Sequence, residues 1–148
     1  MNNIINVNNI SYEYITEEST FKAIDNLNLD VKQGEFVAII GHNGSGKSTL
    51  SKNLNAILMP TKGNILIDGN DTKDEEKLWD IRQTAGMVFQ NPDNQIVATV
   101  VEEDVAFGPE NLGIEPKLIR ERVKEALESV GITELKDYHI YTHRGRIE

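Results

Sequence analysis

Residues 36–50 read FVAIIGHNGSGKSTL. A run of apolar residues leads into a glycine-rich loop, and an amphipathic segment follows the loop. Gly41–Ser48 matches the pattern G-x-x-x-x-G-K-[ST] in full, between a predicted strand and a predicted helix, which is the context that this pattern requires. Gly44 and Gly46 carry no Cβ, so backbone N–H groups can approach phosphate oxygens closely. The stretch therefore predicts a loop that binds the phosphates of a nucleotide.

The residues after the glycines supply the charge and the metal ligand that such a loop needs. The ammonium of Lys47 can reach the β- and γ-phosphates, and the hydroxyl of Ser48 can ligate Mg²⁺. The N-terminus of the helix adds partial positive charge. Residues 41–52 contain two lysines and no acid, so the formal net charge of −9 does not oppose an anionic ligand here. An ordinary glycine-rich turn is the alternative, and the strand–loop–helix context disfavours it.

The remaining pattern predicts an α/β fold with added antiparallel strands. Glu35–Ile40 and Ala85–Phe89 are expected to be strands buried on both faces. The alternation in Leu27–Val31 is typical of a half-buried antiparallel strand, and apolar spacing predicts helices at Ser48–Leu58 and Pro116–Val130. Further expected elements are strands over residues 4–10 and 64–68 and short helices over residues 74–82 and 99–107.

Length and composition exclude several classes of protein. The 148 residues predict one domain, and the 39% hydrophobic content argues against global disorder. The acidic balance argues against a nucleic-acid-binding protein. The absence of cysteine excludes disulfides, thiolate nucleophiles and cysteine-ligated metals. The N-terminus does not resemble a signal peptide, and no stretch is apolar enough to span a membrane, so we expect any membrane role to be peripheral.

Three stretches resemble motifs of the ATP-binding cassette (ABC) proteins. Residues 43–50 (NGSGKSTL) resemble the Walker A motif of that family, and residues 88–92 (VFQNP) resemble its Q-loop. Ser11–Tyr14 is similar to its aromatic A-loop, and the resemblance extends over about residues 3–135. It implies a P-loop NTPase (ABC ATPase) fold with an N-terminal antiparallel β-subdomain, in which residues 1–136 form the N-terminal portion of a nucleotide-binding domain.

A second resemblance is to the ATPase subunits of energy-coupling factor (ECF) transporters, and it rests on residues 91–95 (NPDNQ) and 99–108 (TVVEEDVAFG). Those transporters import vitamins or cobalt and nickel ions. The resemblance implies ATP and Mg²⁺ as cofactors. It also implies a second ABC ATPase subunit, a membrane coupling protein and a substrate-capture subunit as partners, at the cytoplasmic face of the membrane. Ile96 and Val97 are expected to be apolar anchors for the coupling protein, and the acids 102–104 to face basic residues of that protein.

The ABC resemblance also implies roles for individual residues. Tyr14 would stack on adenine, with Tyr12 as the fallback because strand alternation is expected to send Tyr12 into the core. Thr49 would lie near the α-phosphate, and Gln90 would contact Mg²⁺ or its water and sense the γ-phosphate. His42 is expected to be only an exposed loop residue. The full nucleotide-binding set is Tyr14, Gly41, His42, Asn43, Gly44, Ser45, Gly46, Lys47, Ser48 and Thr49, with Ser48 and Gln90 at the metal.

The chain departs from the family after the last predicted helix. There the family has an LSGGQ-type signature, a Walker B strand ending in Asp, a general-base Glu and a switch His, and residues 137–148 (DYHIYTHRGRIE) resemble none of them. The resemblance therefore implies truncation before the signature and Walker B elements, by a frameshift or premature stop, and a chain that binds ATP but is inactive alone. We expect residues 137–148 to be a disordered tail rather than a metal site at His139 and His143.

The missing Walker B strand also affects how the chain is expected to pack. With no Walker B strand between them, the apolar segments 36–40 and 85–89 are expected to have unpaired edges and uncovered faces.

A non-catalytic nucleotide-binding module that docks on transporter subunits is the alternative function. A small-molecule kinase is disfavoured, because no arginine-rich lid segment follows the loop.

Overall fold

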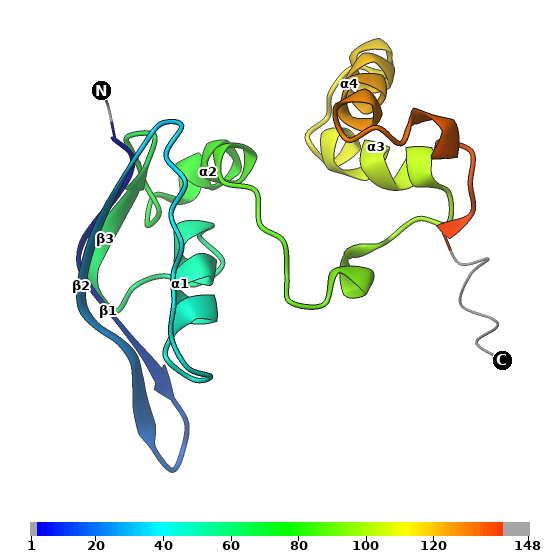
Figure 1. The fold of residues 1–148 in the computed structure, drawn as a ribbon. Helices are drawn as coiled ribbons and strands as arrows, with labels where there is room; N and C mark the ends of the chain where they lie inside the picture. The colour runs from blue at the N-terminus through cyan, green and yellow to red at the C-terminus, as the bar shows by residue number, and fades with distance from the viewer. Residues whose placement is uncertain (1–2, 141–148) are drawn as a thin grey trace, which may run out of the picture. The chain divides into compact units, whose positions relative to one another are not determined.

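The computed structural model describes residues 3–140, apart from the side chain of Pro92. The chain divides between Met87 and Val88 into two compact units, whereas its length predicted one domain. Each unit has its own apolar cluster. Figure 1 shows the helices and strands of both units.

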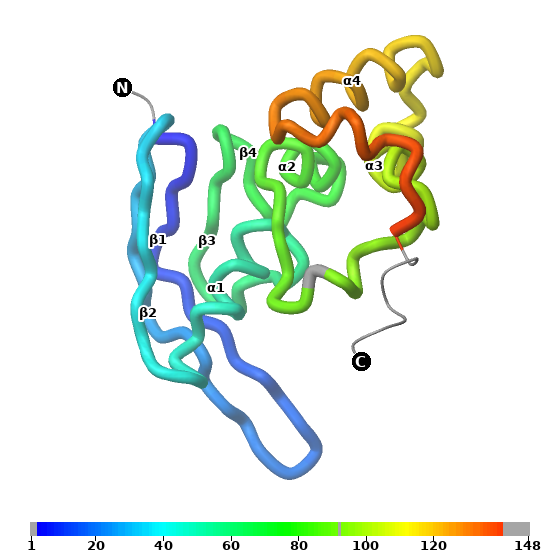
Figure 2. Tube along the Cα trace, turned by 45° about the vertical axis from the view of Figure 1, so that its right-hand side comes forward, coloured from blue at the N-terminus to red at the C-terminus, as the bar shows by residue number. Residues whose placement is uncertain are grey.

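The first unit is built on a four-stranded antiparallel sheet with the strand order β2-β1-β3-β4. Its strands are β1 (Asn3–Ile15), β2 (Thr20–Lys32), β3 (Lys62–Ile67) and the short β4 (Asn70–Asp71). The long β1–β2 hairpin and the pairing of β1 with β3 can be followed along the tube in Figure 2. The predicted N-terminal antiparallel strands are therefore confirmed, and β1 and β2 are both longer than expected.

Two helices cover one face of this sheet, α1 (Lys47–Leu54) and α2 (Leu78–Thr84), the second preceded by the 3-10 turn η1 (Glu75–Lys77) (Figure 1). Leu50 of α1 and Ile81 of α2 are buried against the apolar side chains of the strands. The buried cluster consists of Val7, Ile10, Ile24, Leu50, Ala56, Ile65, Ile67 and Ile81. Helix α1 ends before the predicted Leu58, and Ala56 adopts a φ of 53°, which a continuing helix does not allow.

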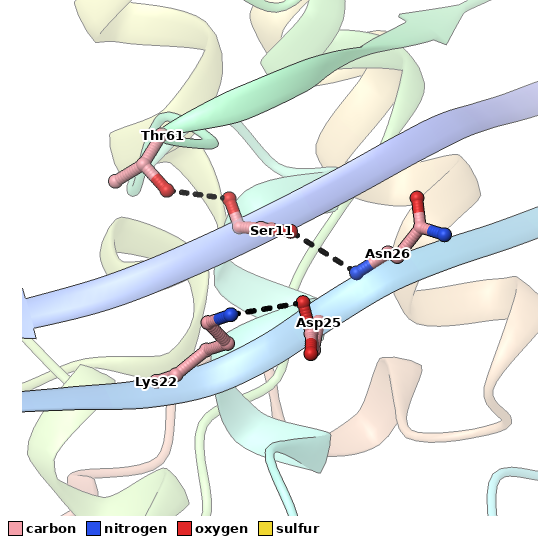
Figure 3. Close-up of polar contacts among 5 residues, drawn as sticks. All are labelled: Ser11, Lys22, Asp25, Asn26 and Thr61. Atoms are coloured by element: carbon pink, nitrogen blue, oxygen red, sulfur yellow. Dashed lines mark hydrogen bonds and ion pairs between the residues drawn. The ribbon is translucent and has the colours of Figure 1, made fainter.

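A buried serine ties three segments of the first unit together (Figure 3). The backbone N–H of Asn26 donates to Ser11 Oγ at 3.0 Å, and Thr61 Oγ1 donates to the Ser11 carbonyl at 2.8 Å. The exposed ion pair between Lys22 and Asp25, at 3.2 Å, lies beside the first of these bonds (Figure 3). Because Asn26 has a φ of 49°, the Ser11 hydroxyl supports an irregular point of β2.

The prediction of two buried strands was wrong. Residues 35–40 and 85–89 form no strand, and the side chains of Phe36, Ile40 and Val88 are 95%, 94% and 81% exposed. An apolar run becomes a strand only where a neighbouring backbone pairs with it and other layers cover it. Within residues 3–140 no strand pairs with either segment, which agrees with the expectation of unpaired edges and uncovered faces.

Within residues 88–140, the second unit contains two helices, α3 (Val101–Asn111) and α4 (Pro116–Ser129), and two 3-10 turns, η2 (Pro92–Gln95) and η3 (Thr133–Leu135). Ala106 of α3 packs with three apolar residues of α4, which are Ile119, Val123 and Leu127. The prediction of a helix that begins at Pro116 is confirmed. The predicted helix over residues 99–107 begins two residues later and extends to Asn111.

The first residues of the predicted tail, residues 137–140, are hydrogen-bonded to the backbone at the start of α3. The N–H groups of Val101 and Glu102 donate to the carbonyls of Tyr138 and Lys136, at 3.1 and 2.9 Å. The N–H groups in the first turn of α3 have no partner within the helix, so these carbonyls cap it. The remaining part of the predicted tail, residues 141–148 with His143, lies outside the described residues.

Candidate functional site

The glycine-rich loop connects the extended segment after β2 to the N-terminus of α1. Gly44 and Gly46 have φ values of 83° and 88°, a region that residues with a Cβ rarely adopt. The N–H of Ser45 donates to the His42 carbonyl at 3.3 Å across the turn. The predicted loop therefore forms where the sequence places it, and its glycines are required by backbone conformation.

Gly46 is also required by the packing of the loop on the sheet. A Cβ at this position would lie 2.4 Å from the carbonyl oxygen of Ala23 in β2, far inside van der Waals contact. At Gly44 a Cβ would meet nothing within 4 Å. The end of the loop thus rests directly on β2, an arrangement that the local sequence pattern does not contain.

Lys47 lies against the loop that precedes it. Its Nζ donates to the carbonyls of Gly41 and His42 at 2.7 Å each and lies 3.4 Å from Ser45 Oγ. The side chain of His42 is exposed, with Nδ1 at 2.8 Å from the Asn43 carbonyl, as expected of a simple loop residue. The positive charge therefore sits among loop backbone groups, where it can attract an anion.

The first turn of α1 has the features of an anion site. Helix α1 begins at Lys47, no side chain forms a hydrogen bond to cap it, and its first turn contains no acid. The N–H groups of a first helical turn have no partner within the helix and carry partial positive charge. Ser48 is exposed in this turn, so its hydroxyl can reach a ligand.

An open cavity of about 290 Å³ lies between this loop and β2. Ala23, Ile24 and Leu27 line it from the strand, and Gly46 and Lys47 line it from the loop. Asp25 and Ser45 line it as well, so its walls combine apolar residues with charged and polar ones, a composition common in ligand sites.

The structure places Tyr14 beside the first turn of α1. Tyr14 Oη lies 3.2 Å from Thr49 Oγ1, and the two residues come from β1 and α1. The Tyr14 side chain is 39% exposed, whereas Thr49 is only 7% exposed. The residues proposed for the base and for the α-phosphate are therefore neighbours.

The prediction that Tyr12 packs against the core is confirmed, but the argument from strand alternation was wrong. Residues two apart on a strand share a face, and the rings of Tyr12 and Tyr14 are in edge-to-face contact, with centroids 4.9 Å apart and planes at 76°. Tyr12 is more buried because it lies nearer to the core along the same strand.

Gln90 belongs to the second unit, so the structure does not place it relative to Ser48. It is exposed in the segment before η2. The neighbouring N–H of Phe89 donates to Gln95 Oε1 at 3.0 Å, which holds the two ends of the segment together. The shared metal role of Gln90 and Ser48 stays a prediction.

Sequence reasoning missed the role of Asp104. One carboxylate oxygen, Oδ1, accepts hydrogen bonds from the N–H groups of Val97 and Ala98, at 2.8 and 3.0 Å. This acid therefore holds the segment before α3 in place, so it is not wholly available to a basic partner. An acid in the first turn of a helix is the one signal in the sequence that points to such a bond.

In the part of the chain that the structure describes, no group of three or more His, Cys, Asp or Glu side chains is arranged to hold a metal ion. None of the helices over the same residues is both long enough and apolar enough to cross a membrane.

Comparisons with known proteins agree on one family. A profile of the ABC transporter family matches residues 24–147. The energy-coupling factor transporter ATP-binding protein EcfA1 of Clostridioides difficile (strain 630) is 81% identical over 137 residues, which cover 93% of this chain and 50% of that relative. The chain thus spans about half the length of the curated relatives it matches.

Solved structures give the same result. The structure of cbiO1 from Clostridium perfringens, described as part of the ABC transporter complex cbiONQ, has a TM-score of 0.79 at 39% identity. The match covers 94% of this chain and 55% of the cbiO1 chain. The structure of the ATP-binding cassette MJ0796, a dimer in a post-hydrolysis state bound to ADP and Pi, has a TM-score of 0.74 at 28% identity. The match covers 92% of this chain and 61% of the MJ0796 chain.

Proposed function

Because the chain belongs to the ABC transporter family, we propose that its loop Gly41–Thr49 binds ATP with Mg²⁺ as part of the ATP-binding subunit of an ECF-type importer. The predicted ABC ATPase fold with an N-terminal antiparallel β-subdomain is confirmed by the family match and by the solved relatives. The single observation that carries the proposal is the loop itself, with Lys47 held against its carbonyls at the uncapped N-terminus of α1.

The residues present fit ATP and Mg²⁺ in charge and in shape. Lys47 and the first turn of α1 offer positive charge to phosphates, and the loop glycines leave backbone N–H groups accessible. Ser48 would ligate Mg²⁺ together with Gln90, Thr49 would contact the α-phosphate, and Tyr14 would stack on the base. Bound Mg²⁺ would neutralise part of the charge on the β- and γ-phosphates.

The proposal extends to partners. We expect a second ABC ATPase subunit, homologous or identical, and a membrane coupling protein with a separate substrate-capture subunit for a vitamin or a transition-metal ion. The protein would then lie at the cytoplasmic face of the membrane. In the second unit, Val97 is 56% exposed beside the segment 90–95, which supports this region as the contact for a helix of the coupling protein. Asp104 is engaged by backbone, so Glu102 and Glu103 are the acids left to attract basic residues.

A matched pair of lysine variants tests nucleotide binding. Lys47→Ala should abolish measurable MgATP binding in calorimetry, because the phosphates lose their nearest cation. Lys52→Ala removes the same charge from the last turn of the same helix and should keep most of the affinity. Equal affinity in both variants and the parent chain would show that the site is misplaced.

Cysteine cross-linking tests the coupling surface. Val97→Cys should cross-link to a cytoplasmic helix of a membrane coupling protein in reconstituted complexes. Glu125→Cys, on the exposed side of α4, serves as the control and should not cross-link. Cross-links from position 125 and none from position 97 would reject this surface.

A further inference from the structure

The contact between Tyr14 and Thr49 joins the two ends of the proposed nucleotide site. Tyr14 Oη and Thr49 Oγ1 are 3.2 Å apart, although the residues are 35 positions apart in the chain. The Tyr14 ring is held by its edge-to-face contact with Tyr12, and Thr49 is buried in the first turn of α1. Both hydroxyl groups are therefore positioned by the fold around them.

Counting protons fixes the direction of this hydrogen bond when a phosphate is present. A threonine hydroxyl has one proton to donate and can accept from other donors, whereas ionised phosphate oxygens only accept. A Thr49 hydroxyl that donates to a phosphate must therefore accept from Tyr14. A tyrosine O–H is well suited to this role, since the phenol is a better donor than an aliphatic alcohol.

We propose that Tyr14 is a positioning residue whose O–H donates to Thr49 Oγ1 and thereby directs the single hydroxyl proton of Thr49 toward a phosphate oxygen of the bound nucleotide. The proposal rests on the proposed function, because it assumes that the loop binds ATP. It adds a role beyond base stacking, since the phenol hydroxyl acts at the phosphate end of the ligand.

The same helix shows what a hydroxyl does without such a partner. Ser51 Oγ, two residues further along, donates to the carbonyl of Lys47, four residues back, at 3.1 Å. Serine and threonine in helices commonly form this bond, and it consumes the proton. The Thr49 side chain instead faces Tyr14, with the two hydroxyl oxygens 3.2 Å apart. The chain from phenol to threonine to phosphate is then charge-assisted, and each bond strengthens the other.

A double-mutant cycle on MgATP affinity tests the link. Tyr14→Phe keeps the ring and removes one oxygen, and Thr49→Val keeps the shape of the side chain and removes the hydroxyl. Each single variant should weaken ATP binding about three- to tenfold, the usual range for one hydrogen bond, and the double variant should be no weaker than Thr49→Val alone. In a Thr49→Ser background, which retains the hydroxyl, Tyr14→Phe should again cost about the same factor.

The outcomes separate this inference from the proposed function. If the parent chain shows no ATP binding that depends on Lys47, the proposed function fails and the inference fails with it. If the parent chain binds ATP but Tyr14→Phe has no effect, or has the same effect in the Thr49→Val background, only the inference is overturned. The cycle is also run on the thermal midpoint without nucleotide, because coupling confined to stability would indicate a purely structural contact and overturn the positioning role.

Discussion

Adding one methyl group at Gly46 tests whether the phosphate loop depends on its contact with β2. The perturbation is Gly46→Ala, and Gly44→Ala in the same loop is the matched control. Their φ values, 88° and 83°, are nearly the same, so both variants carry the same backbone strain of about 1–2 kcal/mol. They differ in surroundings, because only the Cβ at Gly46 would collide with the carbonyl oxygen of Ala23.

The difference in stability between the two variants follows from the distance between the new Cβ and the Ala23 carbonyl oxygen. The new Cβ would lie 2.4 Å from the oxygen, whereas ordinary contact begins at 3.4 Å, so loop and strand must separate by about 1 Å. The oxygen belongs to the backbone of β2, which is paired with β1 on its other side, and it cannot rotate away as a flexible side chain would. Overpacking of this kind costs about 1–3 kcal/mol beyond the strain. Gly46→Ala should therefore cost roughly 2–5 kcal/mol and Gly44→Ala about 1–2 kcal/mol.

The fluorescence of Trp79 gives the readout. It is the one tryptophan of the chain and lies on α2, in the same unit as the loop, so it reports on the unfolding of that unit. Each kcal/mol should lower the thermal midpoint of a unit of this size by about 4–8 °C. ATP affinity should also fall more in Gly46→Ala than in Gly44→Ala. Equal midpoints for the two variants would refute the contact with β2.

Three further predictions concern other parts of the chain. Tyr14→Ala should weaken ATP binding by about 1–3 kcal/mol through lost stacking, and calorimetry measures this directly. Asp104→Ala should lower the stability of the second unit by about 1–3 kcal/mol, because two backbone N–H groups lose their acceptor, while Glu103→Ala should change little in the same chemical denaturation. The chain on its own should show no ATP turnover and should unfold broadly with poor solubility, improved by ATP or by co-expression with a full-length subunit. A sharp transition together with turnover that depends on the phosphate loop would contradict this.

The phosphate loop could be predicted from sequence because its determinants are local. The positive φ values of Gly44 and Gly46, the lysine that follows, and the start of a helix all lie within a few residues of one another. The contacts that make the loop specific are not local. Gly46 touches Ala23 in β2, and Thr49 meets Tyr14 in β1, and neither partner can be identified before the strands are placed.

The strands predicted at residues 35–40 and 85–89 are absent from the structure because a strand depends on partners that are not local. The apolar composition of residues 36–40 predicts burial on two faces, but a strand also needs a paired backbone, and Phe36 and Ile40 are exposed. The acid Asp104 was missed for a related reason, since its charge is visible in the sequence and its two backbone donors are not. In each case the pattern shows what a residue requires and leaves open which segment supplies it.

The exposed side chains near the loop connect the stability of the chain to its proposed activity. Phe36 and Ile40 are almost fully exposed, although they lie in the extended segment that leads into the phosphate loop. Covering one such side chain contributes about 1.5–3 kcal/mol, so covering both would add roughly 3–6 kcal/mol to a total domain stability of about 5–15 kcal/mol. The segment also ends at Gly41, whose carbonyl accepts a hydrogen bond from Lys47. Whatever covers this apolar segment should therefore both stabilise the first unit and hold the entry to the phosphate loop in place, because the same backbone leads from one to the other.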